Sequence, residues 1–342
     1  MNISTLNKII SRFPKANILV VGDLILDQYI WGNVDRVSPE APVPIVWANK
    51  RNYVPGGAAN VANNVRALEG KVSLLGVVGS DLQAKTLISK LKERNINTRG
   101  IFIEDGRRTI LKTRIIAGHQ QVVRVDWEDA HNIKVKTRDK LQAFIQKNIK
   151  DFDAVIIEDY GKGLLDPFLL RLITQEARKN KKIVTVDPKE DNFEYYKGAT
   201  CITPNRKETQ NAVRYLKIKD QENKFKVYND KLATHGDIDQ AARMILQYLN
   251  LESLLVTLGE DGMFLFEKGK SRKHIPTVAQ EVFDVSGAGD TVIGTFTLSL
   301  ACGANKEEAA YISNFAAGIV VGKLGTAVTN RKELTKKILK HE

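Results

Sequence analysis

Short runs of apolar, mostly β-branched residues alternate with longer amphipathic stretches, and this alternation constrains the fold more than any other feature of the chain. Runs of this kind are typical of parallel strands buried on both faces. We expect such strands at 18–21, 72–75, 154–157, 183–186 and 254–257. The stretches between them predict helices at 81–94, 139–149, 167–179 and 237–249. The sequence therefore predicts an α/β protein with a doubly wound, mostly parallel sheet covered by helices on both faces.

Two segments break this alternation. Residues 29–47 contain short β-rich pieces split by prolines, and residues 109–127 alternate polar with apolar side chains. Both patterns are typical of strands in a small separate sheet. We therefore predict one domain over 1–342, with a lid from about 28–48 and 109–127 inserted in it. A polar, lysine-rich stretch at 214–236 has no clear periodicity and is interpreted as a surface insertion.

Composition narrows the class of protein. The net charge is +12, but the lysines are spread along the chain without aromatic stripes or zinc spacing, so no nucleic-acid partner is expected. No apolar run reaches membrane-spanning length, and the N-terminus lacks a secretory pattern. Cys201 and Cys302 lie in apolar surroundings and predict two buried thiols. These features favour the cytoplasm. The five histidines, His119 among them, show no metal-binding spacing.

A glycine-rich motif at 284–290 carries the first sign of chemistry. Gly287, Ala288 and Gly289 precede an apolar helix expected at 291–300, and exposed N–H groups at a helix N-terminus bind anions. Asp290 lies just inside that turn and is placed to take a proton from an attacking hydroxyl. Phosphoryl transfer needs both an anion-binding group for the phosphoryl charge and a base that orients the attacking hydroxyl. An ordinary helix start with an acidic first turn would have the same pattern, so the motif alone leaves both interpretations open.

Further polar residues follow strands or precede helices near the N-terminus. Gly56 and Gly57 allow close approach to the backbone, and Asn60 has an amide suited to a polyol, although a simple helix cap is the alternative. Asp23 and Asp27 follow the first strand, at the edge where ligands bind in such sheets. The chain has neither a P-loop nor a dinucleotide-binding Gly-x-Gly-x-x-Gly after its first strand, which disfavours an oxidoreductase.

With these motifs the chain resembles the ribokinase-type carbohydrate kinases of the PfkB family. Segments 56–60 and 284–290 match the two motifs of the family, 203–208 is similar to its Asn-x-x-Glu motif, and 257–262 is similar to its nucleotide-side turn. The resemblance covers nearly the whole chain. It implies a ribokinase-like fold, the cofactors ATP and Mg²⁺, and Asp290 as catalytic base, with Gly287, Ala288 and Gly289 as the anion hole.

The resemblance also implies roles on the nucleotide side. Glu208 would hold Mg²⁺ through water, and Asp284 would structure the glycine loop or a monovalent-cation site. A capped surface helix at 205–208 and core packing at Asn314 are the simpler alternatives. The residues implied in cofactor binding are Asn205, Arg206, Lys207, Glu208, Thr257, Gly259, Gly262 and Asn314.

Four further segments, 22–29, 36–44, 159–163 and 187–189, are similar to the heptose 7-phosphate kinase branch. This implies phosphorylation of the anomeric hydroxyl of D-glycero-β-D-manno-heptose 7-phosphate for ADP-heptose and lipopolysaccharide synthesis. The alternatives are a kinase for another sugar or sugar phosphate, and a non-catalytic sugar-binding protein. The residues implied in substrate binding are Asp23, Asp27, Gly56, Gly57, Asn60, Arg124, Asp159, Lys162 and Lys189, with Arg36 and Arg114 as further candidates for the phosphate.

Two expectations concern assembly. That branch is often fused to a nucleotidyltransferase, and no motif for such a domain occurs within this chain, so a kinase domain alone is predicted. The exposed edges of the lid strands invite pairing with a second copy, which predicts a homodimer through the lid and no membrane partner.

Overall fold

The computed structural model describes residues 2–118, 120–279, 281–323 and 325–341. Within these residues nine strands form the main sheet, in the order β13-β12-β11-β10-β9-β8-β1-β4-β5. Seven of them are parallel, and β12 and β13 extend one end as antiparallel strands. The bounds are β1 Asn17–Gly22, β4 Lys71–Val78, β5 Asn97–Ile103, β8 Ala154–Glu158, β9 Ile183–Asp187, β10 Cys201–Ile202, β11 Ser253–Thr257, β12 Met263–Glu267 and β13 Lys273–Ile275. The five expected strands are all present.

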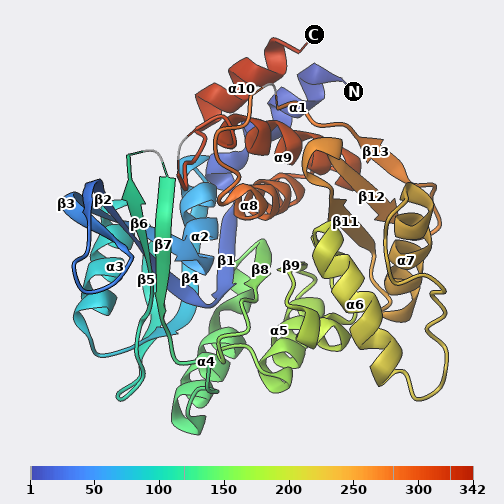
Figure 1. Cartoon of the computed structure of the whole chain (residues 1–342). Coiled ribbons are helices and arrows are strands. Elements are labelled where there is room, and N and C mark those ends of the chain that lie inside the picture. The colour runs from blue at the N-terminus through green and yellow to red at the C-terminus, as the bar shows by residue number, and fades with distance from the viewer. Residues whose placement is uncertain (1, 119, 280, 324, 342) are drawn as a thin grey trace.

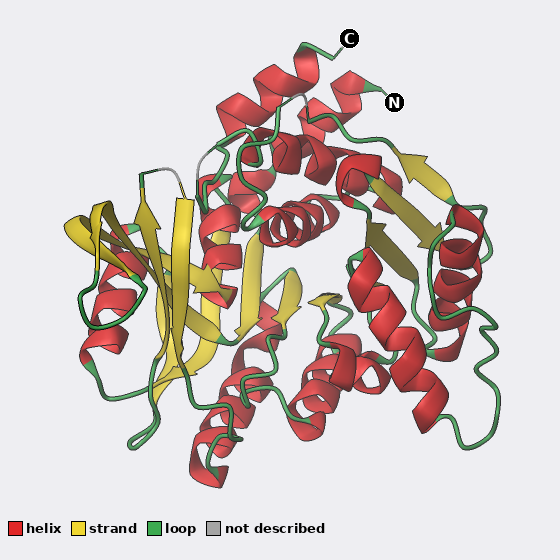
Figure 2. Ribbon diagram, viewed as in Figure 1, coloured by secondary structure: helices red, strands yellow, loops and turns green. Residues whose placement is uncertain are grey.

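Helices cover both faces of this sheet (Figure 2). Strand β1 shows the division: Ile18 and Val20 pack into one core, and Leu19 and Val21 into the other. The first core is covered by α1 Ile3–Ile10, α2 Ala58–Ala67, α3 Leu82–Glu93, α8 Ala288–Ala301, α9 Lys306–Val320 and α10 Arg331–Leu339. The second is covered by α4 Val135–Asn148, α5 Pro167–Lys179, α6 Arg206–Lys219 and α7 His235–Tyr248. The predicted doubly wound fold is confirmed.

Four strands form a second sheet, which we call the lid sheet, in the order β3-β2-β6-β7. Their bounds are β2 Leu24–Val37, β3 Pro44–Gly57, β6 Ile110–Ala117 and β7 Gln120–Trp127. Strand β2 starts two residues after β1 ends, so the lid sheet grows directly from the carboxyl edge of the main sheet (Figure 1).

The β2–β3 hairpin spans 24–57 and is longer than the expected segment of 28–48. The prolines do not split it into short pieces, because Pro39 and Pro42 lie in the connection between the strands and Pro44 is the first residue of β3. Pro55 lies within β3, which is an edge strand, and an edge strand tolerates the missing N–H.

The stretch at 214–236 also differs from its description as one irregular insertion. Helix α6 continues to Lys219 and α7 begins at His235, so only the segment between them is irregular. Phe225, Val227 and Leu232 of that segment are buried in the core. Both cysteines are buried free thiols, as expected. Within the described ranges no helix is both long and apolar enough to cross a membrane. His119 lies outside the described residues.

Candidate active site

The glycine motif and Asn60 meet at the carboxyl edge of the main sheet. Asp290 lies buried in the first turn of α8, and Nδ2 of Asn60 in α2 donates to its Oδ2 at 2.6 Å. Gly287 caps α8 with a φ of 78°, and a Cβ at this position would lie 2.9 Å from Asn60 Nδ2. Both the backbone conformation and the close contact therefore require glycine. The fold brings together two motifs that the sequence separates by 230 residues.

The carboxylate of Asp290 has the electrostatic properties of a base near neutral pH. Burial raises the pKa of Asp290 to about 6, with a smaller contribution from the charge of Asp27, while hydrogen bonds from Asn60 and Tyr160 act in the opposite direction. The side chain is thus mostly ionised at pH 7, yet it binds a proton more tightly than an exposed aspartate does. A general base that works at neutral pH needs this combination.

Two further acids, Glu158 and Asp187, lie beside Asp290. They end the neighbouring strands β8 and β9 in register with each other, and one oxygen from each of the three side chains lies within 4.8 Å of the other two. Oε2 of Glu158 is buried, and no described residue hydrogen-bonds to it. Burial raises the pKa of both Glu158 and Asp187. The charge of Asp187 raises the pKa of Glu158 further, while at Asp187 the charges of Glu208 and Asp290 add to the rise and a hydrogen bond from Glu158 opposes it. Carboxylate oxygens are the ligands that Mg²⁺ prefers, so the cluster fits a magnesium site.

Sequence reasoning did not select Glu158 or Asp187 as functional. A signal was nevertheless present, because an acid directly follows the apolar residues of two adjacent parallel strands. Such a residue is placed at the ligand edge of the sheet, and two in register approach each other closely.

The Asn-x-x-Glu motif begins α6 and forms a capping box. Asn205 Oδ1 accepts from the backbone N–H of Glu208 at 2.9 Å, and Glu208 Oε2 accepts from the N–H of Asn205 at 2.8 Å. Burial raises the pKa of Glu208, whose charge in turn acts on Glu158 and Asp187. The motif therefore caps a helix and also places Glu208 next to the acidic cluster.

The remaining nucleotide-side candidates lie at the amino end of α6, at the carboxyl end of β11 with the turn after it, and within α9. Thr257 ends β11 and bridges to Asn205. Arg206 forms an ion pair with Asp261 at 3.0 Å, in the turn that includes Gly259 and Gly262. Lys207 is exposed. Asn314 is buried, and its Nδ2 donates to the carbonyl of Pro276 at 2.7 Å.

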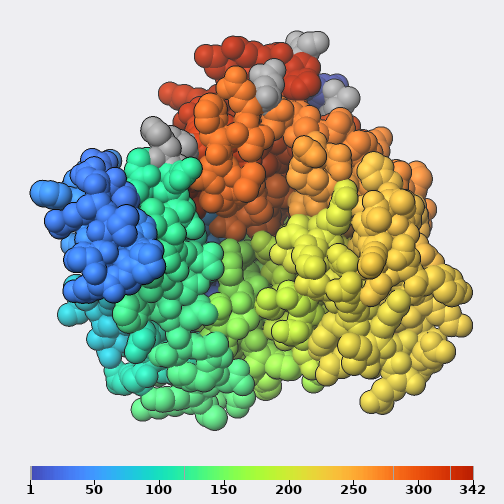
Figure 3. Space-filling view, in the orientation of Figure 1, coloured from blue at the N-terminus to red at the C-terminus, as the bar shows by residue number. Residues whose placement is uncertain are grey.

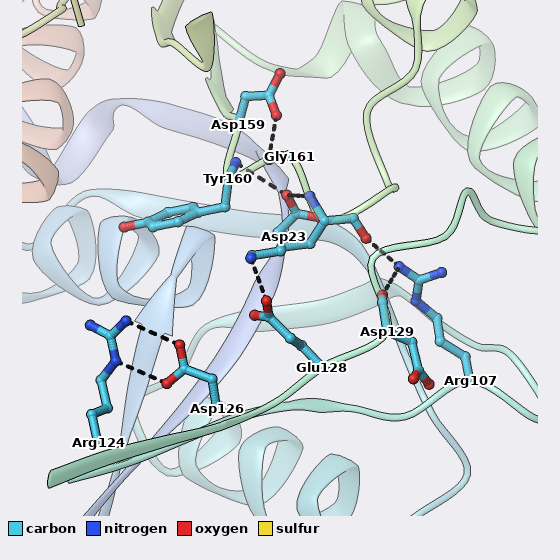
Figure 4. A network of polar contacts seen from close by, with 10 residues as sticks. Asp23, Arg107, Arg124, Asp126, Glu128, Asp129, Asp159, Tyr160 and Gly161 are labelled. Atoms are coloured by element: carbon cyan, nitrogen blue, oxygen red, sulfur yellow. Dashed lines mark hydrogen bonds and ion pairs between the residues drawn. The ribbon is translucent and has the colours of Figure 1, made fainter. Parts of the chain in front are cut away.

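The loop at 159–163 is held by a network of buried polar groups (Figure 4). Oδ2 of Asp23 accepts from the backbone N–H groups of Tyr160 and Lys162, both at 3.1 Å. Arg107, which sequence reasoning missed, donates to the carbonyl of Lys162 at 2.5 Å. Asp159 accepts from the N–H of Gly161 at 2.9 Å. Asp23 and Asp159 thus fix the position of this loop.

The acids and cations predicted for the substrate are paired with each other or with neighbours. Asp27 forms an ion pair with Arg114. A Cβ at Gly56 would collide with the carboxylate of Asp27. Arg124 binds Asp126 through two bonds of 2.9 and 3.1 Å.

The two lysines are paired as well. Lys162 Nζ lies 2.6 Å from Glu128 Oε1, and Lys189 Nζ lies 3.1 Å from Glu190 Oε1.

The surface is hollowed where the lid sheet meets the C-terminal elements, drawn in orange in Figure 3.

The fold and the site together define a ribokinase-like sugar kinase: the doubly wound sheet carries a small second sheet, and an aspartate lies at a glycine-rich helix start. Residues 15–333 match the family described as pfkB family carbohydrate kinase, and the chain belongs to this family. Membership of a kinase family implies the use of ATP and Mg²⁺. The sequence-based assignment to these sugar kinases is therefore confirmed.

Relatives and solved structures agree with this assignment. The bifunctional protein HldE of Desulfatibacillum aliphaticivorans is 42% identical over 95% of this chain, and that of Helicobacter pylori (strain J99) is 44% identical over 93%. The chain spans 63% and 65% of the length of these two relatives.

Arabidopsis thaliana ribokinase, solved with ribose and ATP, has a TM-score of 0.71 at 17% identity, covering 94% of this chain and 98% of that one. Escherichia coli phosphofructokinase-2, solved with potassium, has a TM-score of 0.74 at 17% identity and covers 95% and 98%. These structures share the fold.

Proposed function

We propose that this chain transfers the γ-phosphoryl group of ATP to the anomeric hydroxyl of D-glycero-β-D-manno-heptose 7-phosphate. The product would be the 1,7-bisphosphate used for ADP-heptose and lipopolysaccharide core synthesis. The observation that carries the proposal is the similarity to the HldE proteins, which extends over 93–95% of this chain at 42–44% identity. The heptose-kinase-like segments at 22–29, 36–44, 159–163 and 187–189 support the same branch.

In this proposal Asp290 is the general base. Its Oδ2 is held by Asn60 at 2.6 Å, and its pKa of about 6 leaves it ionised at neutral pH, ready to take the proton of the sugar hydroxyl. The backbone N–H groups of Gly287, Ala288 and Gly289 begin α8 and would stabilise charge on the transferred phosphoryl group. Asn60 Oδ1 is buried and has no hydrogen-bond partner in the part of the chain that the structure describes, so it could accept a hydrogen bond from the sugar.

Three carboxylates would hold the magnesium ion. Glu158 and Asp187 offer buried oxygens beside Asp290, and Glu208 would act through a bound water. When bound, the ion neutralises charge on the ATP phosphates during transfer. The residues proposed on the nucleotide side are Asn205, Arg206, Lys207, Thr257, Gly259, Gly262 and Asn314.

The sugar would lie under the lid sheet, against Asp23, Asp27, Gly56 and Gly57. Arg124 and Lys162 remain proposed partners of its phosphate, and both would exchange a carboxylate neighbour for the ligand. The stem of Lys189 packs against Gly161, and its charge acts on both Asp159 and Glu208. We therefore place Lys189 between the sugar loop and the ATP phosphates.

We also propose a homodimer through the lid sheet. Strand β7 is exposed along its whole length and is an edge strand. Val123, Val125 and Trp127 alternate along it on one face, and all three are exposed. A second copy would cover these apolar side chains and the unpaired strand edge.

The monovalent-cation site is a further proposal. Asp284 accepts from the N–H groups of Ser286 at 2.8 Å and of Gly325 at 3.1 Å, which joins two loops next to the anion hole. Turnover with potassium compared with turnover with a large organic cation would test this site.

An ADP-release assay with a panel of sugars and sugar phosphates tests the main proposal. We expect turnover on heptose 7-phosphate to exceed turnover on ribose and on fructose 1-phosphate by at least about tenfold in kcat/KM. Asp290→Asn is the matched control, because it keeps the side-chain shape and removes the base. Good turnover on another sugar, with none on heptose 7-phosphate, would reject the heptose assignment but keep the kinase. Sugar binding without any turnover would favour a non-catalytic protein.

A further inference from the structure

Lys112 lies near the start of β6, an inner strand of the lid sheet. The strand lies between β2 and β7, and Lys112 is directly opposite Asp27 in one neighbour and Asp126 in the other. Residues opposite each other on paired strands place their side chains on the same face. The register therefore offers this lysine two carboxylate partners.

Both carboxylates are bound by other residues. Arg114 forms an ion pair with Asp27, and Arg124 binds Asp126 through two bonds. A guanidinium group binds a carboxylate with fixed, forked geometry, which an ammonium group cannot match. Within the described ranges, Lys112 Nζ has no hydrogen bond and no ion pair. It lies 5.1 Å from the ring centre of Tyr160.

The charges around Lys112 are only partly balanced. The side chain is half-buried, and burial lowers its pKa; the charges of Asp27 and Asp126 act in the opposite direction, while those of Arg124 and Lys162 add to the lowering. Three cations from two lid strands and the 159–163 loop thus lie near one another. A partly buried ammonium group next to two like charges is stabilised when an anion binds between them.

The position of Tyr160 tells where this anion would lie. Its backbone N–H is fixed by Asp23, and its hydroxyl reaches the carboxylate of Asp290. Lys112 Nζ lies over the ring of this tyrosine, 5.1 Å from its centre. A sugar whose reacting hydroxyl faces Asp290 would therefore lie within reach of the Lys112 ammonium group. The ammonium group would contact a different part of that sugar.

We propose that Lys112 binds the phosphate group of a phosphorylated sugar substrate and is a specificity-determining residue for such sugars. The inference rests on the proposed sugar-phosphate kinase function and deepens it. The phosphoryl groups of ATP have the same chemistry, so the experiment separates the two sources.

Lys112→Met is the test variant, since methionine keeps the length and apolar stem but removes the charge. Lys50→Met is the matched control, because Lys50 also holds its ammonium group 5.2 Å from an aromatic ring, that of Trp31, on the same sheet. We expect Lys112→Met to raise KM for the phosphorylated sugar by about 10- to 100-fold, the usual effect of a lost charged hydrogen bond. The KM for the dephosphorylated sugar and for ATP should change less than about threefold, and Lys112→Arg should restore part of the loss.

Three results would overturn the proposal: equal losses on both sugars, a rise in KM for ATP alone, or no change in KM. If another sugar phosphate is the substrate in place of heptose 7-phosphate, the same comparison is made between that sugar phosphate and its dephosphorylated form. If only neutral sugars are phosphorylated, the role of Lys112 is rejected while the kinase assignment stands.

A second measurement needs no turnover. Acetic anhydride labelling of the full chain, mapped by mass spectrometry, should show less acetylation of Lys112 when inorganic phosphate is present, with Lys50 unchanged as internal reference. Equal labelling of Lys112 with and without phosphate would contradict anion binding at this position.

Discussion

The hydrogen bond from Asn60 to Asp290 sets the pH at which the proposed base works. Asn60→Ala removes a buried amide that donates to the carboxylate at 2.6 Å. A hydrogen bond to a charged group contributes about 1.5–3 kcal/mol, and one pKa unit corresponds to about 1.4 kcal/mol. The bond favours the ionised form, so its loss should raise the pKa of Asp290 by about one to two units. Starting from about 6, the base would then titrate near pH 7 to 8.

The assay is the pH dependence of kcat/KM between about pH 5 and 9, because this quantity reports ionisation in the free enzyme. The acid limb should move to higher pH in Asn60→Ala, so most of the loss in kcat/KM seen at pH 7 should be recovered at pH 9. A constant factor in kcat/KM, due to the lost contact with the sugar, should remain at every pH. Asn64→Ala is the control. Asn64 lies one turn further along α2, and its amide bonds Asn60 and Thr291 at 3.0 and 2.9 Å but not Asp290. An acid limb that stays at its wild-type position in Asn60→Ala would refute the reasoning.

Three further predictions follow from the same contacts. Asp290→Asn should stabilise the fold at pH 7.5 by up to about 3 kcal/mol in urea unfolding, because the raised pKa makes the ionised carboxylate less stable in the folded chain than in the unfolded one. Below about pH 3 the folded and unfolded carboxyls are both mostly protonated. A gain there equal to that at pH 7.5 would contradict this prediction. Gly287→Ala should lower kcat at least about tenfold, because the added Cβ displaces the Asn60 amide. Gly269→Ala is the control: Gly269 has a similar positive φ, and its Cβ would meet no atom within 4 Å, so the substitution should cost only about 1 kcal/mol of stability. Val125→Glu should convert a dimer into a monomer in sedimentation at micromolar concentration; a monomeric wild-type protein under these conditions would reject the lid dimer.

The main sheet was predictable because its strands are short β-branched runs, and burial on both faces leaves little freedom in where they lie. The lid sheet was less predictable. Its strands are partly exposed and mix polar with apolar residues, so the length of the hairpin at 24–57 depends on pairing that periodicity does not express. Pro39, Pro42 and Pro44 were interpreted as breaks between short pieces, although they lie only in the connection of the hairpin and at the first residue of β3.

For the site, the sequence identified side chains but not their partners. Asp290 and Asn60 were both selected, each from its own motif, and their direct hydrogen bond emerges only when α2 and α8 are packed together. Glu158 and Lys112 were missed for a related reason. Glu158 needs the register of β8 with β9, and Lys112 needs the register of three lid strands, before their neighbours become known.

Two of the residues that sequence reasoning missed, Glu158 and Lys112, have opposite electrostatic requirements, and these requirements define the site. Glu158 is a buried acid whose pKa is raised by burial and by Asp187, so its ionised form needs a cation. Lys112 is a half-buried cation without an ion pair among the described residues, so it needs an anion. A magnesium ion with the ATP phosphates would meet the first need, and a phosphorylated sugar would meet the second. Asp290 lies beside Glu158, and Tyr160 contacts both Asp290 and Lys112, so the two unmatched charges lie near the proposed base. This placement of unmatched charge is the physical reason to expect a substrate that carries its own phosphate.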